Sequence, residues 1–552
     1  MNLGRAADPV ADLREAVLSA AAAVRRGTAE LATPPRLERS RREGQGDYAS
    51  NAAMLLAPLM GLPPREIAGR LGEELVGLLG DRLVSYEVAG PGFLNLVLSD
   101  SWHREALRAV LEAGESFASG GAAAPERILI EFVSANPTGP LVAASGRHAA
   151  YGDALARILE HHGNSVAREY YFNDAGSQIR RLGESVQARA RGEEVPEDGY
   201  QGDYVAELAA EIPGAATDDV DAVAAQAVDL MLGSIKRTLD RYGVRFDQFF
   251  SERTLHSGSP SEVERALARL EEAGHIYRSE GALWLRTTTF GDDKDRVLLR
   301  SGGEPTYFAA DVAYMLNKHS RGFERQLLPV GADHHGYVAR LKAAFAALGE
   351  DPDRLEPLIL QFVHLVEDGH AFAMSKRRGD FVTLDDLLDE IGVDATRFFM
   401  LQRSHDRTLE LDVALARSQS QDNPVYYVQY AHARIASVLA RLGPTRMSDA
   451  LAPGADWSFE AGPLHPSERD LIKKLVALPE EIAEAAERRA PHRMAAYALE
   501  LAQDFTAFYR DCHVVGATPE AVESFRVAVC VASQRTLASV LGLLGVSAPV
   551  SM

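Results

Sequence analysis

The sequence predicts an α/β protein: a parallel, doubly wound (Rossmann-like) domain, preceded by an α+β domain and followed by an all-α bundle. Strand, helix and strand patterns follow one another from residue 125, and apolar residues recur at helical spacing after residue 405. A Gly-, Ala- and Ser-rich stretch separates residues 1–118 from both parts. At 552 residues the chain is too long for one hydrophobic core, and its 46% apolar content can fill several.

Residues 1–118 are expected to form a small α+β domain. The segments LREAVLSAAAAV and PPREIAGRLGEELVGLL repeat apolar residues at helical spacing, and VSYEVAGPGFLNLVLS alternates on both sides of a Gly-Pro-Gly turn, as two paired strands do. The stretch that follows, ESFASGGAAAPER, has the composition of a linker. A new domain therefore begins near residue 125.

Residues 125–405 carry two strand–helix–strand sets, the unit of a parallel sheet. The first set is RILIEFV, a helix from about Leu141 to His162, and SVAREYYF; the second is RQLLPVGA, YVARLKAAFAAL and LEPLILQFVHLV. An acidic helical insertion at about 173–260 separates the two sets. Because doubly wound sheets bind ligands beyond the carboxyl ends of their strands, SANPTGPLVAASGRHAAYGD marks the expected site.

Residues 406–552 follow a helical pattern. Ile435, Val438, Leu439 and Leu442 stand at positions i, i+3, i+4 and i+7, and similar stripes recur as far as Leu544. We therefore expect a bundle of helices in this last part.

Charge and composition exclude several classes of protein. The formal net charge of −21 argues against a surface that attracts nucleic acid everywhere, although a local basic face is compatible with it. Because the chain has neither a run of 18 apolar residues nor a charged-then-apolar leader, we expect a cytoplasmic protein without membrane contact. With only Cys512 and Cys530, neither a disulfide framework nor a cysteine zinc site is expected, and no resident metal.

Two stretches could hold a nucleotide. In EFVSANPTGPL, Glu131 ends a strand, and Pro137 and Gly139 impose an extended loop before a helix, a place where backbone N–H groups can hold phosphate. In AMSKRRGDFVTLDDLL, clustered cations that include Lys376, one of seven lysines in the chain, could close over a polyphosphate. The alternatives are a purely structural turn and a solvated basic turn.

Two further stretches could hold a substrate. In PTYFAADVAYMLNK, Tyr307 and Asp311 share one helix face, so a ring and a carboxylate could hold an amino acid, unless the ring belongs to the core. In VGADHHGYVARLK, Asp333, His334 and His335 follow a strand. Adjacent histidines seldom bind the same metal ion, so hydrogen bonding to a substrate is the preferred interpretation.

Taken together, these segments resemble class I arginyl-tRNA synthetases over nearly the whole chain. The resemblance rests on GDYASNAAMLLA, AGPGFLNLVLS, EFVSANPTGPL, REYYFNDAGSQI, TYFAADVAYMLNK, GADHHGYVARLKAA, MSKRRGDFVTLDDLLDEIGVDATRFFML, DNPVYYVQYAHARI and the final LGVSAP. It implies that arginine and ATP form an arginyl-adenylate, in a step that needs bound tRNA, and that arginine then passes to the terminal ribose of tRNA(Arg).

The resemblance also implies a role for individual residues. It places the arginine substrate at Glu131, Asn136, Tyr307, Asp311 and His334, with Glu131 on the guanidinium and Asp311 near the ammonium group. It places ATP, accompanied by Mg²⁺ as part of the substrate, at Pro137, Gly139, Ser145, Gly146, His148, Met374 and Lys376. Ser145, Ser375 and Lys376 are the expected catalytic residues, which act by positioning and charge stabilisation without a protein nucleophile.

One signature of the family is missing. After PTGPL the family carries His-x-Gly-His, whereas this chain has Val142, Ala143, Ala144 and Ser145. Losing one such hydrogen-bond donor typically costs about 2.7–4 kcal/mol in the transition state. We hypothesise that the start of the helix, together with Ser145 and Lys376, replaces the two histidines.

The resemblance places tRNA contacts at both ends of the chain. Tyr427, Tyr430 and Tyr509 match positions that meet the anticodon loop, and His513 stands where the family has a larger aromatic residue. Stacking of one unpaired base on a ring contributes about 1–3 kcal/mol. Without the resemblance these rings would be read as core residues. Asn51 is the expected contact of the N-terminal domain.

Two other functions remain open at this point. A catalytically silent relative would keep the arginine pocket and the tRNA surface as a sensor or regulator, which the missing histidines favour; the retained residues Ser375 and Lys376 favour an active ligase, expected to be a monomer. A cysteine-specific synthetase would need zinc-binding cysteines that this chain lacks.

Overall fold

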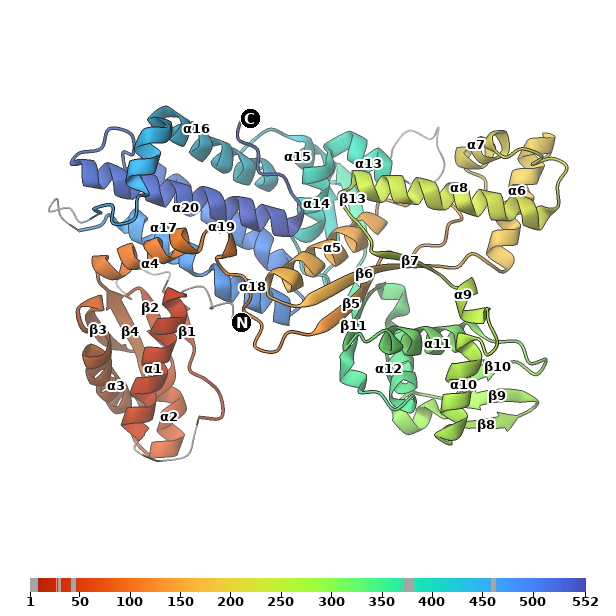
Figure 1. Ribbon diagram of the computed structural model, residues 1–552, viewed down its shortest axis with the longest axis horizontal. Coiled ribbons are helices and arrows are strands. Elements are labelled where there is room, and N and C mark those ends of the chain that lie inside the picture. Colours follow the sequence, from red (N-terminus) through yellow and green to blue (C-terminus); the bar gives the residue numbers. More distant parts are fainter. Residues whose placement is uncertain are drawn as a thin grey trace.

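The molecule is elongated, with a parallel sheet at its centre (Figure 1). A helical bundle covers one end, the N-terminal domain lies beneath this bundle, and two further groups of elements project at the other end. This arrangement confirms the predicted fold class. The computed structural model describes residues 8–25, 27, 31–40, 46–367, 369–371, 382–457 and 463–552.

The N-terminal domain packs helices against an antiparallel sheet of order β1-β2-β4-β3. Its elements are α1 (Pro9–Arg25), β1 (Leu37–Arg39), β2 (Tyr48–Ser50), α2 (Ala52–Met60), α3 (Pro64–Leu79), β3 (Leu83–Ala89), β4 (Phe93–Leu98) and α4 (Asp100–Ala113). The predicted Gly-Pro-Gly turn joins β3 to β4. At Gly92 the φ angle is 140°, and a Cβ atom would lie 2.6 Å from the side chain of Pro64, so this turn requires glycine.

The central sheet has five parallel strands in the order β12-β11-β5-β6-β7. Helix α5 covers one face, and α11 and α12 cover the other, as Figure 1 shows. Leu327 and Leu328 are neighbours in β11 and belong to separate hydrophobic cores, because successive side chains of a strand point to opposite faces. The elements are β5 (Arg127–Glu131), α5 (Ser145–His161), β6 (Ser165–Phe172), β7 (Gln248–Ser251), α11 (Tyr307–Ser320), β11 (Arg325–Gly331), α12 (Val338–Ala347) and β12 (Leu355–Leu360).

Two details of this domain differ from the sequence prediction. Strand β7 pairs with β6 although it lies within the insertion predicted to be helical at about 173–260; its four residues are too few to show a periodic pattern. Helix α5 begins at Ser145 rather than near Leu141. The reason is that the backbone of Leu141 and Ala143 hydrogen-bonds to residues 382–384 instead of continuing the helix.

Two groups of elements extend from the sheet. Helices α6 (Ser177–Arg191), α7 (Asp203–Glu211) and α8 (Val220–Arg241) enclose a small core of their own. The second group was not predicted, and its antiparallel strands are short. It contains α9 (Arg253–His256), α10 (Glu262–Glu272), β8 (Ile276–Ser279), β9 (Ala282–Leu285) and β10 (Arg296–Leu299).

A connecting region links the sheet to the C-terminal bundle. It contains β13 (Val363–Glu367), β14 (His370–Ala371), α13 (Leu384–Ile391), α14 (Val393–Leu401), β15 (Leu409–Asp412) and α15 (Val413–Arg417). Because β15 pairs in parallel with β13, one strand lies among the first residues of the part predicted to be wholly helical.

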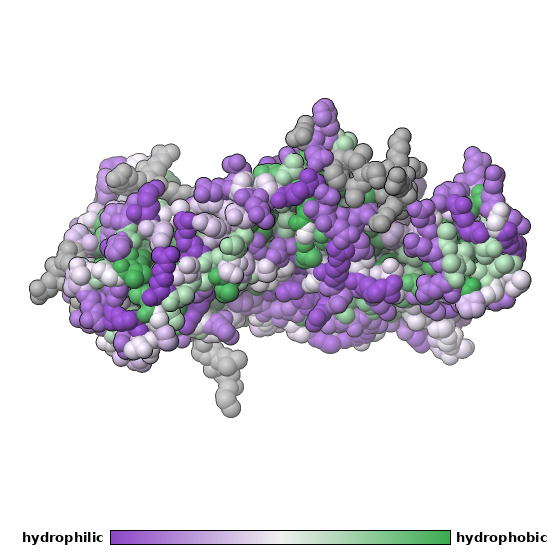
Figure 2. Space-filling model, turned by 90° about the horizontal axis from the view of Figure 1, so that it is seen from above, coloured by the Kyte–Doolittle hydropathy of each residue, from purple (hydrophilic) through white to green (hydrophobic). Residues whose placement is uncertain are grey.

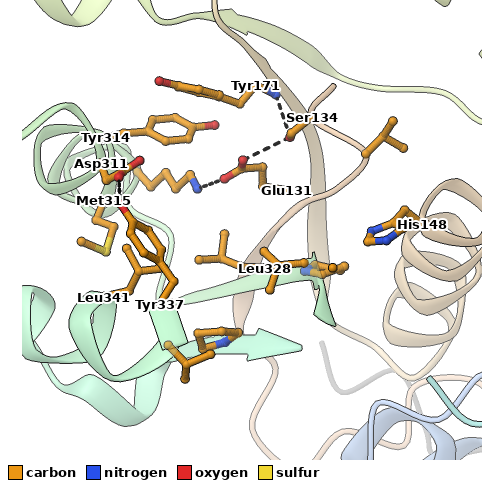
Figure 3. A pocket seen from close by; sticks show the side chains of 17 residues that line it. Glu131, Ser134, His148, Tyr171, Asp311, Tyr314, Met315, Leu328, Tyr337 and Leu341 are labelled. Carbon is orange, nitrogen blue, oxygen red and sulfur yellow. Dashed lines mark hydrogen bonds and ion pairs between the residues drawn. The ribbon is translucent and has the colours of Figure 1, made fainter. Parts of the chain in front are cut away.

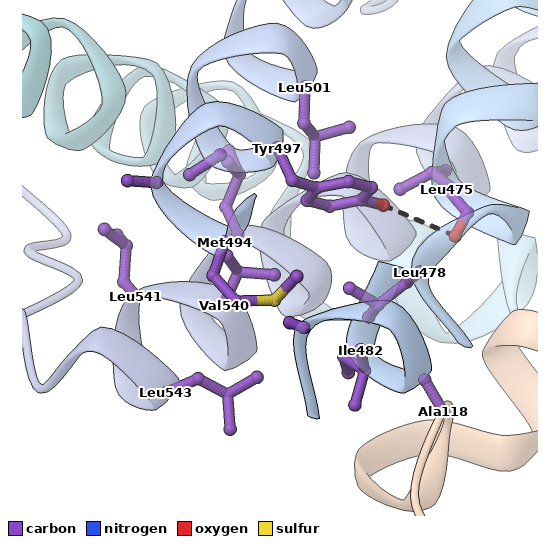
Figure 4. Close-up of a cluster of buried hydrophobic side chains, with 14 of the residues drawn as sticks. Ala118, Leu475, Leu478, Ile482, Met494, Tyr497, Leu501, Val540, Leu541 and Leu543 are labelled. Atoms are coloured by element: carbon purple, nitrogen blue, oxygen red, sulfur yellow. Dashed lines mark hydrogen bonds between the residues drawn. The ribbon is translucent and has the colours of Figure 1, made fainter. Parts of the chain in front are cut away.

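The C-terminal bundle is built around α20, whose buried neighbours include Met494 and Tyr497 (Figure 4). Its helices are α16 (Pro424–Ala450), α17 (Pro466–Val476), α18 (Leu478–Glu487), α19 (His492–Asp511) and α20 (Glu520–Leu544). By length and composition α20 could cross a membrane, but 72% of its most apolar window is buried, as in the core helix of a globular protein. The face of the molecule in Figure 2 is mainly hydrophilic, with hydrophobic residues in separate patches.

The predicted linker is packed against other parts of the molecule. Phe117 and Ala118 are buried, and Figure 4 shows Ala118 beside the bundle. The N–H groups of Gly120 and Ala122 donate to the carbonyls of His161 and His162 at the end of α5. The stretch that connects two domains therefore also contacts the third.

A buried arginine joins the central domain to the bundle. Arg397, on α14, is fully buried and donates to Asp153 on α5, to the Tyr242 carbonyl after α8, and to the Leu544 carbonyl at the end of α20. A Cβ atom at Gly545 would lie 2.2 Å from its guanidinium. This one side chain therefore ties together three helices from distant parts of the sequence.

Candidate active site

The site lies where β5 ends, between the first turns of α5 and α11. After Glu131 the chain turns sharply, and Val133 and Ser134 have φ angles of 67° and 43°, values that non-glycine residues seldom adopt. This turn brings the Ser134 hydroxyl back to Glu131, and it donates to the Glu131 carboxylate at 3.1 Å. The side chain of Glu131 is thereby aimed into a cavity (Figure 3).

Glu131 also forms an ion pair with Lys318, a lysine on α11. Lys318 is 1% exposed, and its ammonium group lies 3.9 Å from the centre of the Tyr314 ring. A buried charge is tolerated only when it is paired, so Lys318 and Glu131 hold each other in place. Both carboxylate oxygens of Glu131 thus accept one hydrogen bond each.

Asp311 faces the same space from the first turns of α11. It accepts a hydrogen bond from the Tyr337 hydroxyl. Burial, reinforced by the negative charges of Glu131 and Glu252, raises the pKa of the Asp311 carboxyl to about 7, although Tyr337 and Lys318 act in the opposite direction. A cation bound here would favour the charged form of this carboxyl.

Two adjoining cavities make up the site. The inner one, of about 270 Å³, is lined by Glu131, Lys318 and apolar residues of β11 and α12. The outer one, of about 310 Å³, is lined by Asn136, Glu252 and Tyr307. Ser134, Tyr171 and Asp311 line both. Three carboxylates against one lysine give this space a net negative character, which suits a long cationic substrate.

The outer cavity is held by the helical extension. The Asn136 amide donates to Gln178 on α6 at 2.8 Å, and its oxygen accepts the N–H of Asn173. Tyr307 is 65% exposed, so it belongs to the rim of this cavity and not to the hydrophobic core. The loop after Asn136 is covered by α7, whose Tyr204 hydroxyl donates to the Thr138 carbonyl at 2.9 Å.

The start of α5 is built from backbone contacts. The Ala143 N–H donates to the Val382 carbonyl at 2.9 Å, and the Leu384 N–H to the Leu141 carbonyl at 2.7 Å. The N–H groups of Ser145, Gly146 and Arg147 donate to the carbonyls of residues 142, 143 and 144. These three donors, expected to be available to phosphate, are therefore already used within the turn.

The side chains of this first turn play different parts. Gly146 allows α5 to approach α13, because a Cβ atom there would lie 2.9 Å from Leu384. Arg147 is buried and donates to the carbonyls of Gln361 and Ser404, and burial lowers the pKa of its guanidinium to about 10. His148 points toward the sheet and lines the inner cavity (Figure 3). Val142 is 37% exposed.

The structure thus places several predicted residues around one site and leaves others outside the description. Glu131, Asp311 and His148 line the inner cavity, and Asn136 and Tyr307 line the outer one. Pro137 and Gly139 lie in the adjoining loop, and Gly139 has the Tyr204 hydroxyl as its close neighbour. Met374, Ser375 and Lys376 lie outside the described residues. His334 belongs to a 3₁₀ turn, Ala332–Tyr337, in which only its backbone is described.

The sequence prediction missed Lys318, Glu252 and Tyr337. Lys318 had a usable signal, since it is one of seven lysines and stands seven residues, two helical turns, after Asp311 on the same helix. Glu252 and Tyr337 reach the site through β7 and the turn after β11, and no local pattern marks them. Among the described residues, no group of three His, Cys, Asp or Glu side chains could hold a metal ion.

The predicted tRNA contacts of the bundle lie on α16 and α19. The rings of Tyr430 and Tyr509 both lie beside the Arg434 guanidinium, at 4.6 and 5.5 Å from their centres. The Tyr427 hydroxyl donates to Thr506 on α19 at 3.1 Å. All three rings are half-buried, whereas His513 is exposed in the loop after α19. In the N-terminal domain, the Asn51 side chain accepts the N–H of Arg36 at 2.8 Å.

Comparison with known proteins gives a consistent result along the chain. Residues 11–98 match the arginyl-tRNA synthetase N-terminal domain, residues 215–421 the class I (R) tRNA synthetase catalytic domain, and residues 428–552 the DALR anticodon-binding domain. A structure from Campylobacter jejuni, named as an arginyl-tRNA synthetase, is 34% identical with a TM-score of 0.76, over 82% of this chain and 100% of that one. The Thermus thermophilus arginyl-tRNA synthetase is 25% identical with a TM-score of 0.77, over 98% of this chain and 100% of that one. The Plasmodium falciparum arginyl-tRNA synthetase, at 14% identity and a TM-score of 0.76 over 98% of each chain, shares the fold.

Proposed function

Because this chain belongs to the arginyl-tRNA synthetase family, we propose a role for each group of its active site. The enzyme is an arginine–tRNA ligase of class I that uses ATP. The observation that carries the assignment of the substrate is the negative pair of cavities at the end of β5, which adjoins the start of α5.

Glu131 and Asp311 bind the guanidinium of arginine in this proposal. Each oxygen of Glu131 accepts one hydrogen bond from Lys318 or Ser134 and keeps a second lone pair, so the carboxylate can still accept from a guanidinium. Asp311 was expected near the ammonium group; because it lines the same cavity as Glu131, it is proposed here as the second carboxylate for the guanidinium. Asn136 and Tyr307, which line the outer cavity, hold the amino acid at its other end, and His334 is a further substrate contact implied by the resemblance.

ATP lies over the start of α5, with Mg²⁺ bound to its phosphates as part of the substrate. Pro137, Gly139 and Gly146 shape the path of the backbone there, and Ser145 and His148 offer side-chain hydrogen bonds. The first N–H groups of α5 already donate to backbone carbonyls of the preceding turn. We therefore expect the side chains of Ser145 and His148, with the positive end of the helix, to stabilise the phosphates more than free backbone N–H groups do. By the family resemblance, Met374, Ser375 and Lys376 also contact the phosphates.

The chemistry then consists of two transfers. A carboxylate oxygen of arginine attacks the α-phosphorus of ATP, and pyrophosphate leaves to give the adenylate. A ribose hydroxyl of the tRNA next attacks the arginyl carbonyl, the hydroxyl proton is lost, and AMP leaves. Both steps require alignment and stabilisation of developing negative charge, and neither requires a nucleophile from the protein.

The tRNA spans the other two domains in this proposal. Tyr427, Tyr430, Tyr509 and His513 meet the anticodon loop, and the N-terminal domain with Asn51 meets another part of the tRNA. Stacking explains why rings beside an arginine suit this role, since every base offers a π-face. We further propose that the enzyme acts as a monomer in the cytoplasm.

Arginine-dependent exchange of pyrophosphate into ATP tests the proposal. Exchange is expected when tRNA(Arg) is present and is expected to stay at background without it. If tRNA binds tightly and exchange stays at background in both cases, the chain is a silent arginine or tRNA sensor, and the proposed roles are wrong.

A further inference from the structure

A third cavity lies far from the active site, where all three domains meet. We call it the joint pocket. It has a volume of about 370 Å³ and lies between the C-terminal end of α4, the 3₁₀ turn Gly114–Ser116, the last turn of α5, and helices α18 and α20. Its apolar walls are formed by Val110, Leu111, Phe117, Leu478 and Ala532.

Three polar side chains of the joint pocket have unused hydrogen-bonding capacity. Within the described chain, the buried Nε2 atom of His161 has no hydrogen-bond partner, while the ring bonds to the backbone of Phe117. Burial lowers the pKa of this imidazole, so it is neutral and Nε2 is free to accept. Arg535 and Glu115 are exposed at the rim, and in the described part of the chain neither makes an ion pair.

These groups together match one class of molecule. Arg535 offers a fork of donors for a carboxylate, Glu115 offers an acceptor for an ammonium group, and the apolar walls offer room for a hydrocarbon side chain. We propose that the joint pocket binds a free α-amino acid with an apolar side chain. This ligand is distinct from the arginine substrate, whose cationic side chain would meet the apolar walls.

The position of the joint pocket gives such a ligand a means to act on the enzyme. Its walls come from the N-terminal domain, from the end of α5 and from the bundle. The linker contributes the buried residue Phe117 to these walls. Helix α5 runs from Ser145 at the candidate ATP site to His161 in this pocket. A bound amino acid would therefore hold the three domains together at the far end of that helix.

Isothermal titration of the full-length protein with L-phenylalanine, in the presence of saturating arginine, tests the proposal. We expect saturable binding that is weakened about tenfold or more by Arg535→Ala, because a charge-assisted hydrogen bond is lost. Arg488→Ala, on a 60% exposed arginine at the end of α18, is the matched control and is expected to leave binding unchanged.

Two analogues separate the contributions of the two charged ends. N-acetyl-L-phenylalanine lacks the ammonium group, so it should bind weakly to the wild type, and Glu115→Gln should not weaken its binding further. L-phenylalaninamide lacks the carboxylate, so it should bind weakly to the wild type, and Arg535→Ala should not weaken its binding further. The proposal is overturned if L-phenylalanine shows no saturable binding, or if Arg535→Ala and Glu115→Gln both bind it as the wild type does.

Discussion

The proposed arginine pocket and the start of α5 are neighbours, but they are built by different means. In the pocket, side chains hold side chains: Lys318 and Ser134 position Glu131, and Tyr337 positions Asp311. At the start of α5, the backbone holds the backbone, through Ala143 with Val382 and Leu384 with Leu141. The two halves of one active site therefore differ in how much they depend on residue identity.

This difference explains where a family signature can be lost. When one side chain of a buried ion pair is replaced, its partner is left as an unpaired charge in the protein interior, which is strongly unfavourable. A segment held by main-chain hydrogen bonds keeps its path when its side chains change. The main-chain hydrogen bonds of residues 141–143 with residues 382–384 do not depend on the side chains of Val142, Ala143 and Ala144. If the family carries two histidines here, as the resemblance implies, their replacement removes side-chain donors and leaves these main-chain contacts in place.

The strongest test of the comparison is Glu131→Gln. Removing one charge of a buried pair typically costs about 2–5 kcal/mol, so kcat/KM for arginine should fall by at least about thirtyfold while KM for ATP stays within about twofold. Steady-state exchange kinetics measure both constants. Glu184→Gln, on a half-exposed glutamate of α6, is the control. An unchanged requirement for arginine would remove Glu131 from the substrate site.

The second test uses pH. Because the pKa of Asp311 is raised to about 7, the carboxyl is charged above that pH and neutral below it. Attraction for the guanidinium should therefore be lost on acidification, and KM for arginine should rise about tenfold for each unit below pH 7. Asp311→Asn should have a high KM that no longer follows this titration. A wild-type KM that stays constant from neutral to mildly acidic pH would contradict the assignment.

The third test addresses the start of α5. Ser145→Ala should slow exchange at saturating arginine by about tenfold, the effect of one hydrogen bond to a charged group, and leave KM for arginine unchanged. Ser165→Ala, at the exposed start of β6, is the control. Equal rates for Ser145→Ala and wild type would show that the side chain of Ser145 does not replace a histidine.

The smallest expected effect concerns Val142. Its backbone bridges to Thr383 and its side chain is 37% exposed, so Val142→Ala should change the exchange rate by less than about twofold. The same exchange measurement decides this point. A fall as large as that of Ser145→Ala would mean that the valine side chain itself contacts the nucleotide, and the contrast between the two regions would disappear.

The same contrast sets what could be predicted from the sequence. Long periodic segments such as those of α16 and α19 were predicted, because burial of one face imposes a repeat. Strand β7 was missed, since its four residues pair with residues 79 positions earlier in the chain and carry no repeat of their own. Glu131 and Asp311 were predicted through the family resemblance and line one cavity, but their roles remain predictions.

Sequence patterns could not predict contacts between residues that lie far apart in the sequence. Lys318 reaches Glu131 across 187 positions, and Glu252 reaches the outer cavity only because β7 joins the sheet. The first N–H groups of α5 donate to the carbonyls of residues 142–144 because the chain forms a tight turn there, and the amino-acid composition does not reveal this turn. The family resemblance predicted substrate contacts, whereas the residues that position those side chains were found only in the structure.

Arg397 limits how freely the parts of this enzyme can be exchanged. Its guanidinium satisfies the last carbonyl of α20 and the carboxylate of Asp153, so the end of the bundle completes the interior of the neighbouring domain. A bundle transplanted from a distant relative would have to bring a matching carbonyl and a glycine at position 545, where any side chain would collide with the arginine. Chimaeras joined near residue 405 should therefore be soluble only when the final turn of the donor helix is kept compatible with Arg397.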